Sequence, residues 1–404
     1  MTNPLSAKTI ALVKATVPAL AAHGPAISKM MYRRLFEHED IYALFNHSNQ
    51  GDNGAQVHAL AAAILAYAQN IENLSALVPV VERVAYKHVG YHILPEHYPF
   101  VADALLGAIS EVLGDTATPE IIKAWGEAYW FLANVLKGRE AVIREEITQL
   151  EGSWSGWREF VIIDKVRESS VITSFVLSPA DGKPVLRHRP GQYLTFRFGA
   201  AGEPTMKRNY SISCAPNGNH YRISVKREAN GMGGSRFLHD HVGVGDVLEA
   251  TPPGGDFFLP EPPQRPVVLL SGGVGLTPMV SMIETIAENH PGLETHYVHG
   301  TMSSATHAME DHVRSLAQQH GGIAIANFYS EPREDDALGH THDVTGFITT
   351  DWLRANTPLA EADIYLCGPK PFLRGLIKDL KRAGVSADRI HFELFGPTDE
   401  VLAA

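Results

Sequence analysis

Residues 267–278 read Val267-Val-Leu-Leu-Ser-Gly-Gly-Val-Gly-Leu-Thr-Pro278, an apolar run that leads directly into a glycine-rich turn. A second apolar run, at residues 364–366, leads into Cys367-Gly368-Pro369 and a helical pattern over residues 371–383. Short apolar runs that each precede a helix are typical of the βα units of a parallel, doubly wound sheet. The sequence therefore predicts an α/β domain over residues 263–404.

The turn that follows the first run has the composition of a phosphate-binding loop. Gly272, Gly273 and Gly275 let the backbone approach a phosphate closely, and Thr277 is placed to cap the following helix. The spacing matches neither Gly-x-Gly-x-x-Gly nor a P-loop, which requires Gly-Lys-Ser/Thr. Taken alone, the turn is explained equally well as a tight βα connection that binds nothing.

Residues 157–262 show the period-two alternation that is typical of strands. Glycine- and proline-containing turns, such as Pro190-Gly191 and Asn217-Gly218, separate the alternating runs. The expected strands cover residues 159–166, 172–177, 193–198, 208–213 and 221–227. This pattern predicts a small antiparallel barrel.

Two stretches of the expected barrel carry groups that could bind a cofactor. In Arg208-Asn209-Tyr210-Ser211 an arginine can pair with a pyrophosphate, a tyrosine can stack on a flat ring, and a serine hydroxyl can bond a ring nitrogen. Further along, Gly233-Gly234-Ser235 precedes a predicted helix, so that free amides gather at a helix N-terminus. By itself, Arg-x-Tyr-Ser fits a half-buried strand better than a binding site.

The first 149 residues show helical spacing and no strand pattern. The expected helices cover residues 4–23, 25–37, 55–73, 75–89, 95–113 and 118–149. Residues 150–156 then form a short linker with glycine and serine. The fold class is thus multidomain, with an all-α part at residues 1–149, a linker at 150–156, a barrel at 157–262 and an α/β domain at 263–404.

The helical part contains seven histidines, and for each of them a surface or core role outweighs a ligand role. His88 stands out, because it ends a helix whose apolar face carries Val81, Val84 and Ala85. A five-coordinate haem needs one proximal imidazole, whose other N–H usually meets an acceptor. Glu140, late in the last long helix, is a candidate acceptor, although a lone helical glutamate is more often solvated.

Composition excludes several classes of protein. The formal charge of −11 over 404 residues argues against a nucleic-acid partner. The two cysteines, Cys214 and Cys367, form no disulfide framework or iron–sulfur ligand set, which fits a reducing cytoplasm. The longest apolar run, residues 59–68, is too short to cross a bilayer, so we do not expect an integral membrane protein.

The ordered set of Arg-x-Tyr-Ser, Gly-Gly-Val-Gly-x-Thr-Pro, Cys-Gly-Pro and a terminal aromatic resembles the ferredoxin-NADP reductase superfamily over about residues 155–404. The resemblance implies FAD on the barrel and NADH or NADPH on the parallel sheet. In it, Arg208 holds the FAD phosphate with its neighbour Asn209, Tyr210 stacks on the flavin, Ser211 approaches its redox nitrogen, and Tyr193 borders the ring. The residues implied to line the remaining cofactor path are Gly233, Ser235, Gly272, Gly273, Val274, Gly275, Leu276, Thr277, Cys367, Gly368, Pro369, Leu394, Phe395, Gly396 and Pro397.

The helical part resembles the globin of the bacterial flavohaemoglobin family, through Leu44-Phe-Asn-His-Ser-Asn-Gln50, Asn70-Ile-Glu-Asn-Leu74 and Ala124-Trp-Gly-Glu-Ala-Tyr129. With the reductase attached, the resemblance spans the whole chain. It implies that the globin part binds haem b and that His88 ligates the haem iron. On the distal side, the resemblance implies that Tyr32 donates a hydrogen bond to bound oxygen, that Phe45 packs against the haem, and that Gln56 and Leu60 line the pocket. On the proximal side, it implies a hydrogen-bond relay formed by Tyr98 and Glu140. It also implies that the charged residues Lys87 and Glu393 lie between haem and flavin.

The same resemblance implies a nitric oxide dioxygenase, which converts NO and O₂ to nitrate with NAD(P)H electrons passed through FAD to haem. We expect a monomer, although the sequence leaves the oligomeric state open, and the haem pocket could also take a lipid. Two other functions remain open: a haem-based oxygen sensor or store, and an NAD(P)H:acceptor reductase with a regulatory globin. The sequence shows neither an acidic partner for an adenosine ribose nor an arginine for a 2′-phosphate, so NADH and NADPH both remain candidates.

The chain departs from the family pattern at a few positions. His47 stands where the family often has methionine, and Met31 where an aromatic residue is common. One extra residue in the loop before Ala55 makes the place of Gln56 less certain. That insertion also leaves open whether His58 swings in as a sixth haem ligand.

Overall fold

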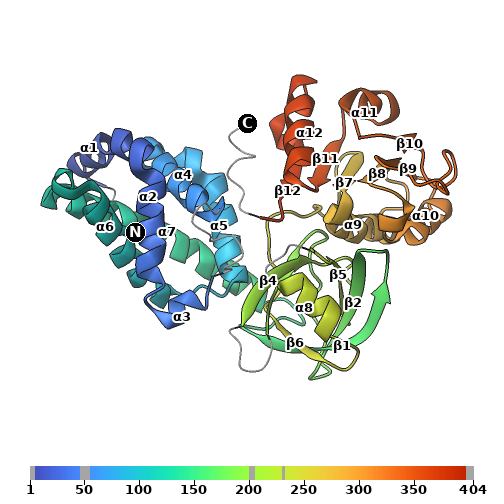
Figure 1. The fold of residues 1–404 in the computed structure, drawn as a ribbon, viewed down its shortest axis with the longest axis horizontal. Coiled ribbons are helices and arrows are strands. Elements are labelled where there is room, and N and C mark those ends of the chain that lie inside the picture. Colours follow the sequence, from blue (N-terminus) through green and yellow to red (C-terminus); the bar gives the residue numbers. More distant parts are fainter. Residues whose placement is uncertain (1–4, 46–54, 200–204, 230–232, 397–404) are drawn as a thin grey trace.

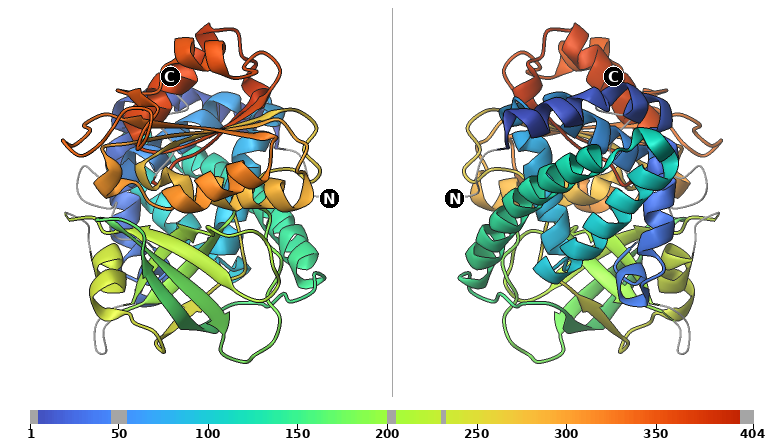
Figure 2. Two further views of the ribbon diagram at one scale, coloured as in Figure 1. Left: turned by 90° about the vertical axis from the view of Figure 1, so that its right-hand side faces the viewer. Right: turned by 90° about the vertical axis from the view of Figure 1, so that its left-hand side faces the viewer.

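The computed structural model describes residues 5–45, 55–199, 205–229 and 233–396. It contains three parts: a helical part, an antiparallel sheet and a parallel α/β sheet (Figure 1). Seen from the side, the helical part covers one flank of both sheet-containing parts (Figure 2). The expected multidomain fold class is confirmed.

The helical part packs around a core that includes the fully buried side chains of Ile27, Leu35 and Trp125. Its helices are α1 (Ala7–Ala15), α2 (Val17–Leu35), α3 (Glu39–Tyr42), α4 (Ala55–Asn70), α5 (Val78–Gly90), α6 (Tyr98–Leu113) and α7 (Pro119–Thr148), with short 3₁₀ turns η2 (Leu74–Leu77), η3 (Pro95–His97) and η4 (Gly114–Thr116). Pro119 begins α7, which suits proline because the N–H of a first-turn residue needs no partner within the helix.

The break expected between the first two helices, near Gly24, is wrong. The chain breaks at Thr16, whose hydroxyl donates to the Val13 carbonyl, and Pro25 lies inside α2. A Cβ on Gly24 would lie 3.3 Å from Ala61 Cβ, so this glycine allows α2 and α4 to approach closely and does not end a helix.

No single helix in the described ranges is long and apolar enough to cross a membrane. Helices α1 and α2 meet that length and composition test only when they are taken together as a pair bent by 65°.

The second part is a six-stranded antiparallel sheet in the order β4-β3-β6-β1-β2-β5. Its strands are β1 (Arg158–Arg167), β2 (Ile172–Pro179), β3 (Tyr193–Phe198), β4 (Met206–Ser211), β5 (Tyr221–Lys226) and β6 (Val247–Ala250), and it carries helix α8 (Gly234–His241). A bridge between Ile212 and Ile223 joins the end of β4 to β5, so the two edges meet as in a barrel. The sequence did not predict β6, which is only four residues long.

The third part is a six-stranded parallel sheet in the order β10-β9-β8-β7-β11-β12. Its strands are β7 (Val267–Gly272), β8 (Thr295–Thr301), β9 (Ile323–Tyr329), β10 (Val344–Thr345), β11 (Asp363–Cys367) and β12 (Ile390–Glu393). Helices α9 (Leu276–Asn289) and α10 (Glu310–Gln319) pack into one core cluster, whereas α11 (Thr350–Asn356) and α12 (Lys370–Arg382) pack into another. The strand order reverses between β7 and β11, where doubly wound sheets bind ligands at the carboxyl ends of their strands.

Candidate active site

One cavity of about 1110 Å³ runs between the three parts of the chain. Residues from the helical part line one end, residues of the antiparallel sheet line the middle, and residues of the parallel sheet line the other end. Of the residues singled out from the sequence, those on its wall are Tyr32, Phe45, Gln56, Leu60, Lys87, His88, Tyr98, Tyr193, Arg208, Asn209, Tyr210, Ser211, Gly234, Ser235, Gly272, Gly273, Val274, Gly275, Thr277, Gly368, Pro369, Glu393, Leu394, Phe395 and Gly396.

At the helical end, His88 belongs to a hydrogen-bonded group of three side chains. His88 Nδ1 lies 2.7 Å from Glu140 Oε1 and 3.1 Å from the Tyr98 hydroxyl, which itself donates to Glu140. Glu140 is fully buried, and its other oxygen faces Arg144 Nη2 at 3.5 Å. Since both Nδ1 and the Tyr98 hydroxyl point at one carboxylate, Nδ1 carries a proton and donates to Glu140, so Nε2 is the ring nitrogen that remains for another partner.

The Tyr98 hydroxyl stays protonated in this group. Burial, together with the hydrogen bond to Glu140 and the charge of that carboxylate, raises the pKa of Tyr98 well above its usual value. Tyr98 therefore serves as a fixed donor to Glu140, and Glu140 remains an acceptor for His88.

Aromatic and apolar side chains from α2 and α4 and from the turn after α3 also line this end. Tyr32 is 9% exposed and packs against Phe36 and Phe45, with ring centroids 5.6 Å and 5.8 Å away. Gln56 and Leu60 lie on the same wall, one turn apart on α4. His58 is exposed and is not on the wall, so the described geometry does not bring it to the cavity.

The middle of the cavity is formed by β3 and β4, whose residues Tyr193 and Ser211 are paired in register. The buried Tyr193 hydroxyl and Asn209 Oδ1 have no hydrogen-bond partner among the residues that the structure describes. A Cβ on Gly234, the first residue of α8, would come within 2.8 Å of Arg208 Nε. Gly233 caps α8 with φ of +97° and does not reach the wall. Buried polar atoms without partners indicate a place for a polar ligand.

The loop between β7 and α9 lines the other end. Gly273 has φ of +54°, and a Cβ placed on it would meet nothing within 4 Å, so the loop faces open space there. A Cβ on Gly275 would overlap the Cys367 carbonyl, which explains glycine at this position. Leu276 and Cys367 are buried behind the wall.

Thr277 does not cap α9 as expected. The helix already begins at Leu276, and the Thr277 hydroxyl donates to the Val274 carbonyl at 3.1 Å. Because the 3₁₀ turn η5 (Gly273–Gly275) runs directly into α9, no extended cap residue separates the loop from the helix.

Lys87, on the globin-side helix α5, and Glu393, at the end of β12, both line the cavity. Burial raises the pKa of Glu393 to about 7, while the charge of Lys87 opposes that rise. Leu394 is buried and Phe395 is 49% exposed. Pro397, which the sequence placed beside them, lies outside the described residues.

Comparison with known proteins agrees with this division of the chain. The family model for globins matches residues 28–136, and the model for the oxidoreductase NAD-binding domain matches residues 269–378. Over 405 residues, the chain is 60% identical to a flavohemoprotein of Xylella fastidiosa, with 100% of both chains covered. The chain belongs to the flavohemoprotein family.

Other flavohemoproteins and solved structures agree with this assignment. The flavohemoprotein of Rhizobium meliloti is 44% identical and covers 97% of this chain, with 98% of its own length matched. The flavohemoglobin of Malassezia yamatoensis, solved with bound FAD and heme, superposes with a TM-score of 0.86 at 27% identity, covering 98% of this chain and 100% of its own. The FAD/NAD-binding domain of a nitric oxide dioxygenase from Vibrio cholerae has a TM-score of 0.54 at 38% identity, covering 59% of this chain and 99% of its own.

Sequence reasoning missed much of the flavohemoprotein cavity wall. The missed residues are Met31, Leu35, Ile41, Leu44, Tyr91, Ile93, His97, Val101, Tyr129, Leu132, Ala133, Leu136, Ser224, Val225, Lys226, Glu228 and Lys370. Helical spacing predicts that most of the apolar residues among them are buried. It predicts the same for the rest of the core, so it does not distinguish residues that line the cavity. Ser224 and Val225 lie in a predicted strand that carried no motif.

Proposed function

We propose that this flavohemoprotein is an NAD(P)H-dependent nitric oxide dioxygenase that converts NO and O₂ to nitrate, with haem b, FAD and NADH or NADPH as its cofactors. The observation that carries the proposal is the single cavity, which joins the His88 group to the Arg208–Ser211 strand and to the Gly272–Gly275 loop. The relationship to flavohemoproteins supports it, as does the similarity to the reductase domain of a nitric oxide dioxygenase. We further propose that the domains span residues 1–149, 157–262 and 263–404, with the linker at 150–156.

The helical end fits a haem. It is an apolar pocket, one imidazole whose Nε2 remains for another partner lies on its wall, and that imidazole is fixed by Glu140 and Tyr98. In this proposal His88 Nε2 holds the iron, and the carboxylate at Nδ1 gives the imidazole more basic character. Tyr32 would serve as a donor for the small-molecule substrate on the distal side, which Phe45, Gln56 and Leu60 would shape; all four line the cavity.

The middle of the cavity fits FAD. Arg208 and the amide end of α8 would hold phosphate, and glycine is needed at position 234 because the Arg208 side chain packs directly against it and leaves no room for a Cβ. The Tyr193 hydroxyl and Asn209 Oδ1 would gain the partners that they lack among the described residues. Tyr210 would stack on the flavin ring, Ser211 would approach its nitrogen, and Phe395 would cover the other face.

The far end fits a nicotinamide nucleotide. The glycine loop at residues 272–275 and the segment Gly368-Pro369 form adjacent walls at the carboxyl ends of β7 and β11. In this proposal Lys87 and Glu393, which both line the cavity, would lie between haem and flavin, where their charges would bear on both cofactors. When bound, the cofactors supply oxygen binding and electron transfer, which side chains alone cannot perform.

The test is an assay of the purified holoprotein under air. We expect NO to accelerate NAD(P)H oxidation, with nitrate as the product in proportion to the NO consumed. His88→Ala should abolish that acceleration, while the flavin still passes electrons to an added chemical acceptor. An oxygen sensor or store would bind oxygen without NO-dependent NAD(P)H oxidation, and a reductase with a regulatory globin would need a separate protein acceptor.

A further inference from the structure

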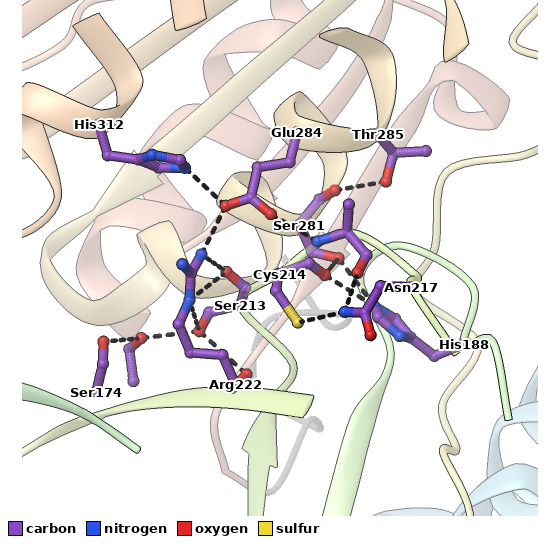
Figure 3. Close-up of polar contacts among 12 residues, drawn as sticks. Ser174, His188, Ser213, Cys214, Asn217, Arg222, Ser281, Glu284, Thr285 and His312 are labelled. Atoms are coloured by element: carbon purple, nitrogen blue, oxygen red, sulfur yellow. Dashed lines mark hydrogen bonds and ion pairs between the residues drawn. The ribbon is translucent and has the colours of Figure 1, made fainter. Parts of the chain in front are cut away.

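The carboxylate of Glu284 joins the parallel and antiparallel sheets of the reductase (Figure 3). Glu284 lies on α9 and is 9% exposed. Its Oε1 accepts from Arg222 Nη2 at 2.6 Å and pairs with His312 Nε2 at 2.7 Å, while Oε2 accepts from the Ala215 N–H at 2.6 Å. Burial alone would raise the pKa of Glu284, but these donors lower it below its usual value. Glu284 is therefore a charged group whose two oxygens are both bonded.

The partners of Glu284 continue toward the cavity. Arg222 lies on β5 and also donates to the Ser213 carbonyl. The Ser213 hydroxyl lies 2.8 Å from the Ser224 hydroxyl, and Ser224 is on the cavity wall. The charge on α9 is thus connected, through the side chains of Arg222, Ser213 and Ser224, to the wall at which we place the flavin.

A second contact lies one turn earlier on α9. The Ser281 hydroxyl donates to the Cys214 carbonyl at 2.7 Å. Burial lowers the pKa of His188 to about 3, so its ring is neutral at pH 7 and Nε2–H donates to the same carbonyl at 3.0 Å. Ser281 and Glu284 thus hold this segment at two points, the Cys214 carbonyl and the Ala215 N–H, and both contacts restrain α9 against it.

The two segments that these contacts join, residues 213–215 and α9, each adjoin a part of the chain that we place next to a cofactor. Residues 213–215 follow Tyr210 and Ser211 on the same chain segment, and α9 directly follows the loop at residues 272–275. We propose that Glu284 is a positioning residue for hydride transfer, which fixes the nucleotide-binding loop against the strand that carries Tyr210 and Ser211. This inference rests on the proposed function of the reductase half. The step moves one hydride from C4 of the dihydronicotinamide to the flavin, so the nucleotide loses two electrons and the flavin gains them.

The experiment compares Glu284→Gln with Glu288→Gln in the FAD- and haem-loaded protein. Glu288 lies one turn further along α9 and is exposed, so its variant makes the same charge change without touching the contact. Flavin reduction by NADH and by NADPH is followed anaerobically over a range of nucleotide concentrations. Amide hydrogen exchange over residues 272–289 is measured in parallel, together with electron transfer from photoreduced flavin to haem.

We expect Glu284→Gln to lower the limiting rate of flavin reduction by on the order of 100-fold, as a displacement of about 1 Å can do. Half-saturation by nucleotide should change less than about threefold, and flavin-to-haem transfer less than about twofold. Hydrogen exchange over the loop and α9 should become faster. Glu288→Gln should match the parent protein in every measurement.

A limiting rate for Glu284→Gln that matches Glu288→Gln would overturn the proposal. If Glu284→Gln fails to bind FAD, His312→Gln decides, because its side chain is 41% exposed and can be changed without opening the core. It should lower the same rate by about tenfold, and an unchanged rate would reject the role of Glu284. Flavin reduction needs neither NO nor oxygen, so failure of the dioxygenase assay leaves this test intact.

Discussion

At the scale of single residues, His88 differs in its surroundings from the other histidines that the structure describes in the globin part. Its Nδ1 is bound to a fully buried carboxylate, and it lies on the wall of an apolar pocket, whereas His58 is exposed. We predict that His88→Ala gives protein with its full FAD content and little haem, measured as the ratio of Soret to flavin absorbance. His58→Ala is the control and should keep the ratio of the parent protein. A normal Soret band in His88→Ala would reject His88 as the iron ligand.

A second prediction concerns His307, a buried residue of the α/β domain whose Nδ1 lies 3.0 Å from the Tyr329 hydroxyl. Burial lowers the pKa of His307 to about 4. In the unfolded chain the His307 imidazole takes up a proton near pH 6.5, whereas in the folded chain it does so only near pH 4. The contribution of neutral His307 to the free energy of unfolding is therefore complete above about pH 6.5. It is lost as the pH falls toward 4, by up to about 3 kcal/mol.

The check is urea unfolding of the holoprotein between pH 4.5 and 7 in about half-unit steps. His307→Asn should give a shallower fall in the free energy of unfolding, because it removes one of the protons taken up on unfolding. His23→Gln, on the exposed face of α2, is the control and should keep the parent slope. An unchanged slope for His307→Asn would show that His307 is not one of the groups that take up a proton.

At the scale of elements, the loop between β7 and α9 has no room for a side chain at Gly275, because a Cβ would overlap the backbone of Cys367. We predict that Gly275→Ala lowers the free energy of unfolding by about 1–3 kcal/mol and weakens nucleotide binding. Gly375→Ala is the matched control: it lies inside α12, where a Cβ would meet nothing within 4 Å. It should raise stability by about 0.5–1 kcal/mol. Equal effects of the two changes in urea unfolding would contradict this account.

At the scale of the whole molecule, the globin part is attached to the barrel next to its proposed haem ligand. The buried Thr251 hydroxyl donates to the Gly90 carbonyl at 2.8 Å, two residues from His88. Thr195 lies beside the same glycine, but its hydroxyl has no partner among the described residues. The two threonines therefore form a matched pair, one with a hydrogen bond to lose and one without.

We predict that Thr251→Val lowers stability by about 1–3 kcal/mol, because it leaves a buried carbonyl without a donor. It should also slow electron transfer from photoreduced flavin to haem. Thr195→Val should be neutral or slightly stabilising in thermal unfolding and should leave the transfer rate unchanged. If both variants transfer electrons at the parent rate, this hydrogen bond does not set the distance between the cofactor sites.

The extent to which the fold was predictable differs between elements. Strands β7 and β11 and helices α5 to α7 were predictable, because their apolar spacing is local and their turns carry glycine or proline. Strand β6 was not, because four residues give too short an alternation. The break at Thr16 was missed because Gly24 and Pro25 resemble a helix boundary, and only the contact with Ala61 shows why the glycine is there.

The sequence by itself determined the three-part order, the chemistry of the side chains available to each part, and the motifs that place them at strand and helix ends. Only the tertiary structure decided which side chains meet. His88 and Glu140 are 52 residues apart in the sequence, and Arg222 and Glu284 are 62 residues apart. In each pair, the first residue nevertheless donates a hydrogen bond to the carboxylate of the second. Periodicity reports which face of an element is buried, but partner choice depends on how those faces pack over long separations in the chain, and no local pattern contains that information.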